Sequence, residues 1–396
     1  MLRPDPYNIF KRVFADNNTW EILLVLSLAF SILFSLISIS LVQVFLALGL
    51  VFWIVLLIRR ERKFLFPSFF WPLLAYTALS LVSSAFSVNS MMSFIDCRKM
   101  LLFLIVPIVY TAYRKKEELD LAVFALLASA FASTIYSLVY YVLKASPGQR
   151  VKGFMGHYMT QAGILALFGS FALGLIFFGP GKWRIAWAAG LVLSGLASIL
   201  TLTRSGWIGL AVGLCVILLI WKPKTIILVP VAAGLLFFVS PQAVKNRAKS
   251  IFSLQGYSNW ERIAYLKAGI EIIKDYPLFG TGPDTVDMVY QNPKYGLDES
   301  AKRNVHLHSN FTQIAAERGI VTLAAWLAFL IWAFVSLIKR LKTKDPSIVP
   351  LAAGSLAALA ALFVSGLFEY NFGDSEVTTL FLFLLAAPFA LERVRS

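Results

Sequence analysis

Long apolar runs alternate with short polar or basic breaks along the chain from residue 22 to residue 391. A run of about 20 apolar residues is long enough to cross the roughly 30 Å hydrocarbon layer of a membrane as an α-helix. The first two runs are nearly continuous, and the tenth is long enough to begin outside the bilayer. The pattern predicts twelve crossings, at residues 22–37, 39–58, 69–86, 99–113, 119–143, 161–178, 184–202, 205–221, 225–240, 310–338, 348–368 and 376–391. We therefore expect residues 1–396 to form one all-α, polytopic membrane domain.

Composition supports this assignment and excludes a water-soluble globule. Hydrophobic residues make up 59% of the chain and charged residues only 14%, whereas soluble domains are nearer half apolar and a quarter charged. Residues 1–20 are polar, and the first apolar run merges into the second without a small-residue cleavage site, so we expect no cleavable signal peptide. Cys97 lies near the end of one predicted helix and Cys215 inside another, which gives no support to a disulfide or a thiolate metal site.

Positive charge is concentrated in the breaks between the apolar runs, and the formal net charge is +15. The basic breaks recur at every second loop: RRERK (59–63), RKK (114–116), KWR (182–184), KPK (222–224), KRLKTK (339–344) and ERVRS (392–396). Cytoplasmic loops of membrane proteins carry an excess of lysine and arginine. We therefore place these breaks and both chain termini in the cytoplasm. The charge then reports topology, and we expect membrane lipids as partners and no nucleic acid.

One loop on the opposite side is much longer than its neighbours. Residues 241–309, about 70 residues between predicted helices 9 and 10, contrast with external loops of about 5 to 20 residues. The segment WERIAYLKAGIEIIKDYP (260–277) has apolar residues at 263, 266, 270 and 273, the spacing of an amphipathic helix, and GTGPD (280–284) follows as a turn. We expect this helix to lie on the bundle or in the membrane interface. The loop serves either as a packed cap or as a functional element.

Several arginines fall where the apolar runs meet the external side. Arg204 lies in a break of a few residues, Arg98 at the mouth of the fourth run, and Arg262 at the start of the amphipathic segment. Arginine at such depth is costly unless an anion satisfies it, and its guanidinium binds phosphate oxygens in a bidentate manner. A pyrophosphate-bearing lipid fits this set. The alternative is that each arginine reaches the lipid headgroups or pairs with a carboxylate such as Asp96 or Glu261.

An acidic turn, GLFEYNFGDSEV (366–377), follows the eleventh run. It contains Glu369, Asn371, Asp374 and Glu376. These carboxylates can orient a base, bind sugar hydroxyls or pair with the arginines; the alternative is a solvated turn with salt bridges to Arg318 or Lys302. A separated Asp-x-Asp element, which metal-dependent sugar transferases often use, is lacking, so we expect metal-free chemistry.

Two of the three histidines, His306 and His308, stand just before the tenth run. Histidine accepts a proton near neutral pH, so an imidazole beside a sugar hydroxyl would act as a general base. The alternative is an interfacial histidine at a helix start that Ser309 or Asn310 caps. Spacing alone does not distinguish the two histidines.

These residues resemble a known family. HSNFTQIAAERGIVT (308–322) is similar to the O-antigen ligase signature, in which a histidine is followed by Asn, Ser or Gln, nine residues, and Gly-x-x-Gly. His308, Ser309 and Gly319 match it, and Thr322 replaces the last glycine. The segments TLTRSGWIGL (201–210), WERIAYLKAGIEIIKDYPLFGTGPD (260–284) and GLFEYNFGDSE (366–376) also resemble elements of the superfamily of O-antigen ligases and polysaccharide polymerases.

The resemblance implies a fold, a location and roles for the site residues. It implies a GT-C-like bundle of about 12 transmembrane helices in the bacterial inner membrane, with the active site and the large loop facing the periplasm. His308 would be the catalytic base that deprotonates the acceptor. Arg204 and Arg262 would bind the diphosphate of the donor, with Arg98 as a weaker addition to that group, and His306 and Glu369 are the further residues assigned to substrate binding.

The implied function is an O-antigen ligase. It would transfer a glycan from undecaprenyl pyrophosphate to a lipid A-core sugar with inversion, using no cofactor and no metal. The nearest alternative is an O-antigen or polysaccharide polymerase, whose acceptor is a second lipid-linked glycan. A transporter or flippase of a lipid-linked sugar is the alternative from a different class. We find no internal repeat, and the polar groups collect at one face, which disfavours a transporter.

Overall fold

The computed structural model describes residues 13–146, 148–251, 253, 257–299, 301–343 and 345–395. Within these residues the regular structure is helical and includes no strand, so the all-α expectation is confirmed there. The polar start at residues 1–12, Lys344 of one basic break and the terminal Ser396 lie outside the described residues.

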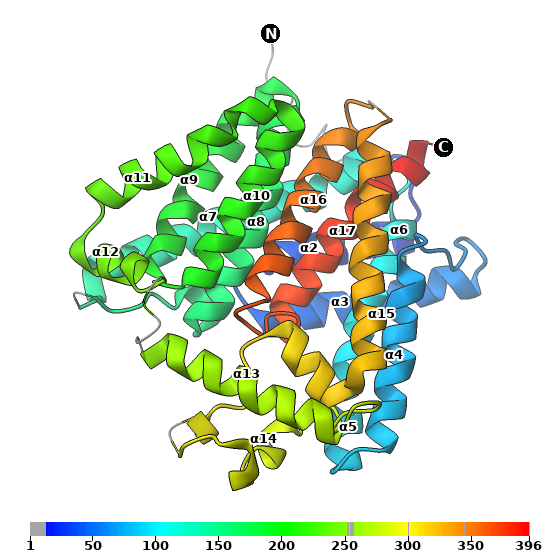
Figure 1. Cartoon of the computed structure of the whole chain (residues 1–396). Coiled ribbons are helices and arrows are strands. Elements are labelled where there is room, and N and C mark those ends of the chain that lie inside the picture. The colour runs from blue at the N-terminus through cyan, green and yellow to red at the C-terminus, as the bar shows by residue number, and fades with distance from the viewer. Residues whose placement is uncertain are drawn as a thin grey trace.

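The helices pack as one bundle (Figure 1). In chain order they are α2 (Thr19–Leu33), α3 (Ile39–Ile58), α4 (Phe70–Ala85), α5 (Ser90–Cys97), α6 (Ile105–Ala112), α7 (Lys116–Lys144), α8 (Tyr158–Phe178), α9 (Arg184–Leu200), α10 (Arg204–Trp221), α11 (Leu228–Val239), α12 (Gln242–Lys249), α13 (Tyr257–Asp275), α14 (Val286–Val289), α15 (Asn310–Leu341), α16 (Ile348–Ser365) and α17 (Ser375–Arg395). Short 3-10 helices lie between them: η1 (Arg98–Leu104), η2 (Gly153–Met155), η3 (Gly181–Trp183), η4 (Pro223–Ile227), η5 (Pro293–Tyr295) and η6 (Ala301–Arg303).

Eight helices of the described chain are long and apolar enough to cross a membrane: α3, α7, α8, α9 together with η3, α10, α15, α16 and α17. Three further apolar helices, α2, α4 and α11 together with η4, are shorter. The predicted run at 99–113 is helical from Arg98 to Ala112, where the 3-10 helix η1 leads directly into α6. The chain is thus a multi-pass helical membrane protein, while the count of twelve crossings stays a prediction.

Helices α8, α16 and α17 form the centre of the bundle, and most of their residues are buried. Small side chains allow α8 and α16 to approach closely. A Cβ added to Gly174 of α8 would lie 2.3 Å from the backbone nitrogen of Gly354 in α16. Close backbone contact of this kind replaces the hydrophobic driving force that is lost between helices in lipid. The loops at the ends of these helices are therefore held by a rigid core.

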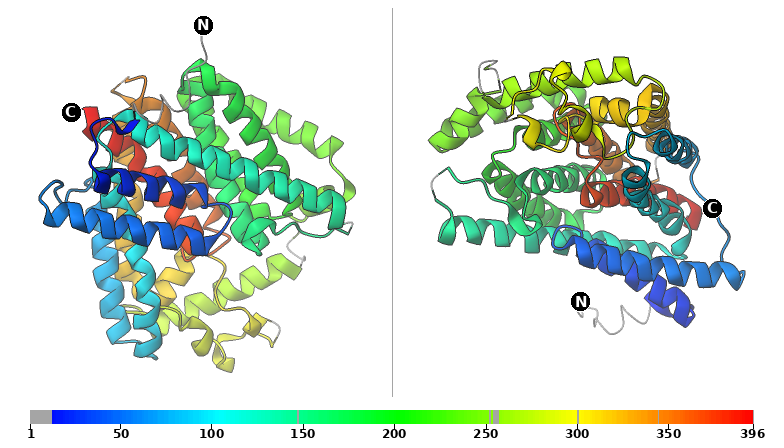
Figure 2. Two further views of the ribbon diagram at one scale, coloured as in Figure 1. Left: turned by 180° about the vertical axis from the view of Figure 1, so that it is seen from behind. Right: turned by 90° about the horizontal axis from the view of Figure 1, so that it is seen from below.

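Several basic breaks meet at one end of the bundle. Nε of Arg393 donates a hydrogen bond to the carbonyl oxygen of Tyr110 at 2.6 Å, and Nε of Arg62 donates to that of Thr111 at 3.0 Å. Helices α13 and α14 lie at the opposite end (Figures 1 and 2). The separation of these breaks from the long loop agrees with the alternation in the sequence. Which end faces the cytoplasm stays a prediction.

The long helix α15 is kinked at Gly319, where φ is 82° and ψ is 165°. The segment 277–282 packs into the kink: Thr281 N–H donates to the carbonyl oxygen of Ala316 at 2.9 Å, and Ile320 N–H donates to that of Pro277 at 2.9 Å. A Cβ at position 319 would lie 1.9 Å from the carbonyl oxygen of Leu278. The signature glycine is therefore required both by its conformation and by its contact with this segment.

Helix α13 confirms the predicted amphipathic helix, which packs on the bundle. Tyr265, Ala268 and Ile272 are fully buried against the bundle, in a cluster that includes Ala316 of α15. On the predicted apolar face, Ile273 is partly buried against this cluster, while residues 263, 266 and 270 are 38%, 47% and 43% exposed. The exposed apolar residues remain suited to the membrane interface.

Candidate active site

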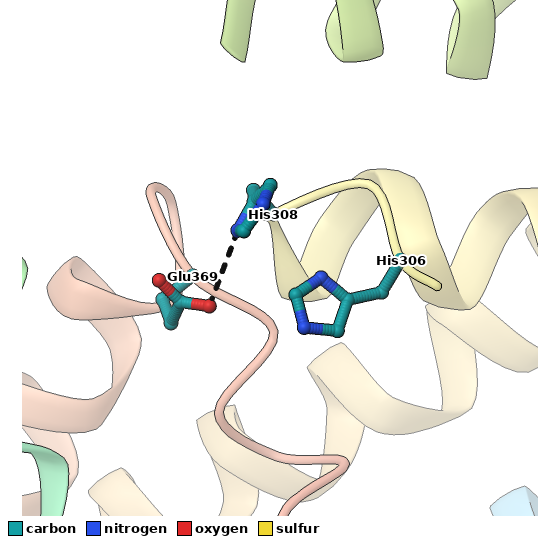
Figure 3. Close-up of side chains that lie close together, drawn as sticks. All are labelled: His306, His308 and Glu369. Atoms are coloured by element: carbon teal, nitrogen blue, oxygen red, sulfur yellow. Dashed lines mark hydrogen bonds and ion pairs between the residues drawn. The ribbon is translucent and has the colours of Figure 1, made fainter. Parts of the chain in front are cut away.

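His308 lies in the loop before α15 and faces Glu369 in the loop between α16 and α17 (Figure 3). Its Nδ1 atom is 3.3 Å from Oε1 of Glu369, and the two side chains are only 12% and 9% exposed. The φ of His308 is 53°, in the left-handed region. Such a conformation costs a residue with a Cβ roughly 1 kcal/mol or more, and it persists where surrounding contacts enforce it. The two loops must therefore be firmly held.

Asn310 joins these two loops. Its backbone N–H donates to the carbonyl oxygen of Gly366 at 2.8 Å, its Nδ2 donates to Oδ1 of Asn371 at 2.7 Å, and its Oδ1 accepts from the N–H of Phe372 at 3.0 Å. Ser309 is the N-cap residue of α15, but its side chain makes no capping hydrogen bond. Neither side chain therefore caps α15, because that of Asn310 bonds to the neighbouring loop and that of Ser309 makes no capping bond.

His306 lies beside the His308–Glu369 pair. Its ring is edge-to-face with that of His308 at a centroid distance of 4.6 Å, and 6.1 Å from that of Tyr370. Its Nδ1 atom is buried and has no hydrogen-bond partner among the described residues. Burial, reinforced by the positive charge of His308, lowers the pKa of His306. This imidazole is thus uncharged at neutral pH and can bind a substrate group.

Glu369 remains a carboxylate despite its burial. Burial alone raises its pKa, but the hydrogen bond from His308, the charge that His308 carries when protonated and the charge of Arg262 outweigh it and lower the pKa below its ordinary value. Nη2 of Arg262 is 3.9 Å from Oε2, and its Nε donates to the carbonyl oxygen of Phe368 at 3.1 Å. Because a carboxylate only accepts hydrogen bonds, Nδ1–H of His308 donates to it. Nε2 of His308 is then the atom that accepts a proton.

A second group of positive charges surrounds the turn at 201–204. Arg204 begins α10 and is 6% exposed; its Nη1 donates to the carbonyl oxygen of Ser250 and its Nη2 to Oδ1 of Asn259, each at 2.6 Å. Nε of Arg150 donates to the carbonyl oxygen of Thr201 at 2.9 Å, and Nη2 of Arg150 donates to Oγ1 of Thr203 at 2.8 Å.

Arg247 of α12 completes this group. Its Nε donates to the carbonyl oxygen of Leu202 at 2.9 Å, and Leu202 has a left-handed φ of 51°. The carbonyl oxygens of this strained turn thus face the guanidinium groups of Arg150 and Arg247, and Arg204 follows directly in the chain. Three guanidinium groups therefore lie together at this turn, where the sequence predicted only that of Arg204.

Electrostatics connects the arginines to the histidines. Burial lowers the pKa of Arg150 to about 10, and the charges acting on it include those of Arg247, Glu369 and Arg262. The charges acting on His157 include those of Glu369, Arg150 and His308, and burial is the main reason that its pKa is lowered. All three histidines of the chain are therefore within electrostatic reach of one carboxylate. The cluster is strongly positive, with Glu369 as its central anion.

Asp374 extends this network on the other side. Thr160 donates a hydrogen bond to Oδ2 of Asp374 at 3.1 Å, and the same hydroxyl is 3.4 Å from Nδ1 of His157. Burial raises the pKa of Asp374 to about 7, with further contributions from the negative charges of Glu376 and Glu369. Burial of this carboxyl group is unfavourable for the stability of the fold. Carboxyl groups with a pKa shifted in this way are typical of functional sites.

His306, His308 and Glu369 could together hold a metal ion, because one ligand atom from each lies within 4.8 Å of the others. Two imidazoles and one carboxylate are a donor set that zinc accepts. The charge of Arg262, which acts on the same carboxylate, opposes a divalent cation here. The arrangement fits an anionic ligand better than a cation.

Most of the site residues predicted from the sequence are brought together. His306, His308, Glu369 and Arg262 form one group, and the charge of Arg262 also acts on Arg204. Arg98 is placed elsewhere. It lies in η1 and lines a separate surface pocket with Lys99, Asp96 and Asp284.

The acidic turn is not a solvated one. Glu369 and Asn371 are 7% and 5% exposed. The salt bridges proposed for it are wrong: Arg318 pairs with Asp96 and Glu317, and Lys302 pairs with Glu299. These partners are nearer because Arg318 lies on the buried face of α15 and Glu299 is only three residues from Lys302.

Arg150, Arg247 and His157 were missed by sequence reasoning. They are single polar residues in loops or in the short helix α12, and only tertiary packing brings them to the turn at 201–204 and to Glu369. The available signal was small: Arg150 and His157 stand in RVKGFMGHYM (150–159), a loop that carries positive charge although it is not one of the recurring basic breaks.

Comparison with known proteins bears on this site. The family model described as O-Antigen ligase matches residues 189–327. No curated protein matches the chain. The matched stretch runs from α9 into α15 and contains Arg204, Arg262, His306 and His308. The resemblance found in the sequence is confirmed over this stretch, which is similar to the O-antigen ligase family within the superfamily of O-antigen ligases and polymerases.

Replacing Asp374 with Asn should stabilise the protein at high pH. The folded-state pKa of about 7 lies above the ordinary value of 3.8, so ionisation disfavours the folded state as the pH rises through this range. Asp374→Asn should raise the thermal midpoint clearly at pH 8, and the gain should shrink as the pH falls to 4. Glu299→Gln, at a side chain that is 87% exposed, is the control and should change little. A midpoint that falls at pH 8, or a gain independent of pH, would contradict the burial of this carboxyl group.

Proposed function

We propose that the protein is a glycosyltransferase that moves a glycan from undecaprenyl pyrophosphate to a lipid A-core sugar, as an O-antigen ligase. The observation that carries the proposal is the pairing of a buried imidazole, His308, with Glu369 at the edge of a group of arginines. A base next to a binding site for negative charge is what transfer from a lipid diphosphate requires. We further propose that the protein lies in the inner membrane, with this site and the large loop at 241–309 facing the periplasm.

His308 acts as the base in this mechanism. Its Nε2 takes the proton of an acceptor hydroxyl while the hydroxyl oxygen forms a bond to the anomeric carbon of the donor sugar. The bond between that carbon and the diphosphate oxygen breaks on the opposite face, so the configuration inverts. Glu369 holds the imidazole through Nδ1 at 3.3 Å and stabilises its protonated form.

The arginines stabilise the leaving group. Negative charge grows on the diphosphate as the bond breaks, and fixed guanidinium groups stabilise that charge more in the transition state than in the ground state. Arg204 and Arg262 are the proposed contacts, and Arg150 and Arg247 join them from the same turn. His306, uncharged and next to His308, is proposed to orient the acceptor.

The same donor site would serve a polymerase, whose acceptor is a lipid-linked glycan, so the acceptor decides between the two functions. A flippase is less well supported. Transporter sites lie near mid-membrane between repeats, whereas these polar groups lie in loops and at helix starts at one end of the bundle.

The acceptor assay tests the function directly. Purified protein, given undecaprenyl-diphosphate-linked glycan and lipid A-core, should form ligated product with EDTA present and ATP omitted. A second reaction supplies only the lipid-linked glycan, and elongated chains there would identify a polymerase. Loss of product on chelation, restored by zinc, would instead assign a metal to His306, His308 and Glu369. Absence of product in every reaction would end the transferase proposal.

Replacing His308 with Ala should abolish turnover and leave donor binding nearly unchanged, because the base acts on the acceptor hydroxyl. We expect a fall in kcat of about a hundredfold or more, within the range for general bases. Glu369→Gln should lower kcat as well and shift its pH profile, because the amide no longer stabilises the imidazolium. Steady-state kinetics and donor binding are measured together. A larger loss from His306→Ala than from His308→Ala would show that the other histidine is the base.

Replacing a single arginine of the site should weaken binding of the donor diphosphate or stabilisation of the leaving group. Arg204→Ala or Arg262→Ala should each reduce kcat/KM by about a hundredfold, comparable to the loss of one oxyanion-binding group. Arg98→Ala removes the same charge from the same end of the bundle, and since Arg98 lines a separate pocket it is the matched control. Thermal midpoints are measured to exclude misfolding. Wild-type activity in both site variants, or an equal loss in Arg98→Ala, would refute the diphosphate assignment.

A further inference from the structure

Helix α11 is apolar throughout, yet none of its residues is buried. Leu235, Leu236 and Val239 are 64%, 52% and 80% exposed. An apolar helix that does not pack tightly against protein must obtain its apolar contacts from lipid. The space between α11 and the rest of the bundle is therefore suited to a hydrocarbon chain.

That space contains a defined cleft of about 340 Å³. Its walls come from the last turns of α7 and α9 on one side and from α11 and α12 on the other. The hydrocarbon side chains that form the walls include Leu138, Leu196, Ile199, Leu236 and Val239. No charged residue lines it among the described residues. The cleft excludes ionic headgroups and accepts an apolar chain.

One end of the cleft reaches the arginine turn. Gln149 and Leu202 line that end. The carbonyl oxygen of the same Leu202 accepts the hydrogen bonds from Nε of Arg247 at 2.9 Å and from Nη2 of Arg150 at 3.3 Å. An apolar cleft and a cluster of guanidinium groups thus share one residue. A molecule with a hydrocarbon chain attached directly to a phosphate group matches this arrangement, because its chain fits the cleft and its phosphate fits the guanidinium groups.

We propose that this cleft binds the first isoprene units of a polyisoprenyl diphosphate, whose diphosphate lies against Arg150, Arg204 and Arg247. The inference rests on the proposed function and adds where the lipid chain enters. A phospholipid fits less well, because a glycerol backbone separates its phosphate from two acyl chains while the cleft adjoins the arginines directly. Anchored in this way, the chain fixes the direction in which the sugar projects from the diphosphate.

Two soluble probes, inorganic pyrophosphate and farnesyl diphosphate, separate the contribution of the chain from that of the diphosphate. Their affinities for the protein in lipid nanodiscs are measured by direct binding, which requires no turnover. The wild type should bind farnesyl diphosphate at least about tenfold more tightly, the gain expected from burying two or more methylene groups. Leu196→Trp and Leu236→Trp, which fill the cleft, should remove this advantage and leave the affinity for pyrophosphate unchanged. The matched control is Ile331→Trp, at a 62% exposed position of α15.

Several outcomes would overturn the inference. Tryptophan variants that retain the advantage of farnesyl diphosphate would place the chain elsewhere, and equal competition by phosphatidylglycerol would make the cleft a general lipid site. Leu236→Ala, which only widens the cleft, should still reduce the advantage about threefold if a tryptophan variant fails to fold. A wild type that shows the chain advantage but transfers no glycan would contradict the proposed function and leave the cleft assignment standing. A wild type that binds pyrophosphate but shows no advantage for farnesyl diphosphate would contradict the cleft assignment and leave the proposed function standing.

Discussion

The pairing of the buried Glu369 carboxylate with His308 is the interaction on which the site depends. A carboxylate removed from water is unfavourable unless positive groups and hydrogen bonds compensate it. His308 and Arg262 supply that compensation from two distant segments, so the charge of one residue fixes the positions of both. The same carboxylate acts on Arg150 and His157 as well. Glu369 is the central anion of this group of described cations, which is therefore suited to an anionic ligand.

The fold holds the His308–Glu369 pair in place. The rigid α8–α16–α17 core supports the loop that carries Glu369, and the kink at Gly319 lets α15 begin beside it and then turn into the membrane. Asn310 joins the two loops through three buried hydrogen bonds. Two of the four described non-glycine residues with a positive φ, His308 and Leu202, lie where the imidazole and the arginines are presented. Local strain compensated by a stable scaffold is the pattern expected of a functional site.

The sequence predicted the helices well because membrane-length apolar runs are a strong local signal. It also predicted His308, Glu369 and Arg262, which stand in recognisable motifs. It did not reveal details that packing decides: part of one expected span is the 3-10 helix η1, and α13 buries Tyr265 while residues 263, 266 and 270 stay partly exposed. Arg150 and Arg247 were missed because their importance comes from a turn more than 40 residues away in the sequence. Arg98 carries the same charge at the same end of the bundle, but its position in the fold places it in another pocket.

The most direct measurement is an experimental structure of the protein with undecaprenyl pyrophosphate bound. The diphosphate should contact the guanidinium groups of Arg204 and Arg262, with Nε2 of His308 facing the position of the anomeric carbon. Density for the diphosphate beside Arg98 and Lys99, or among the basic residues around Arg62 and Arg393 at the other end of the bundle, would contradict the central claim.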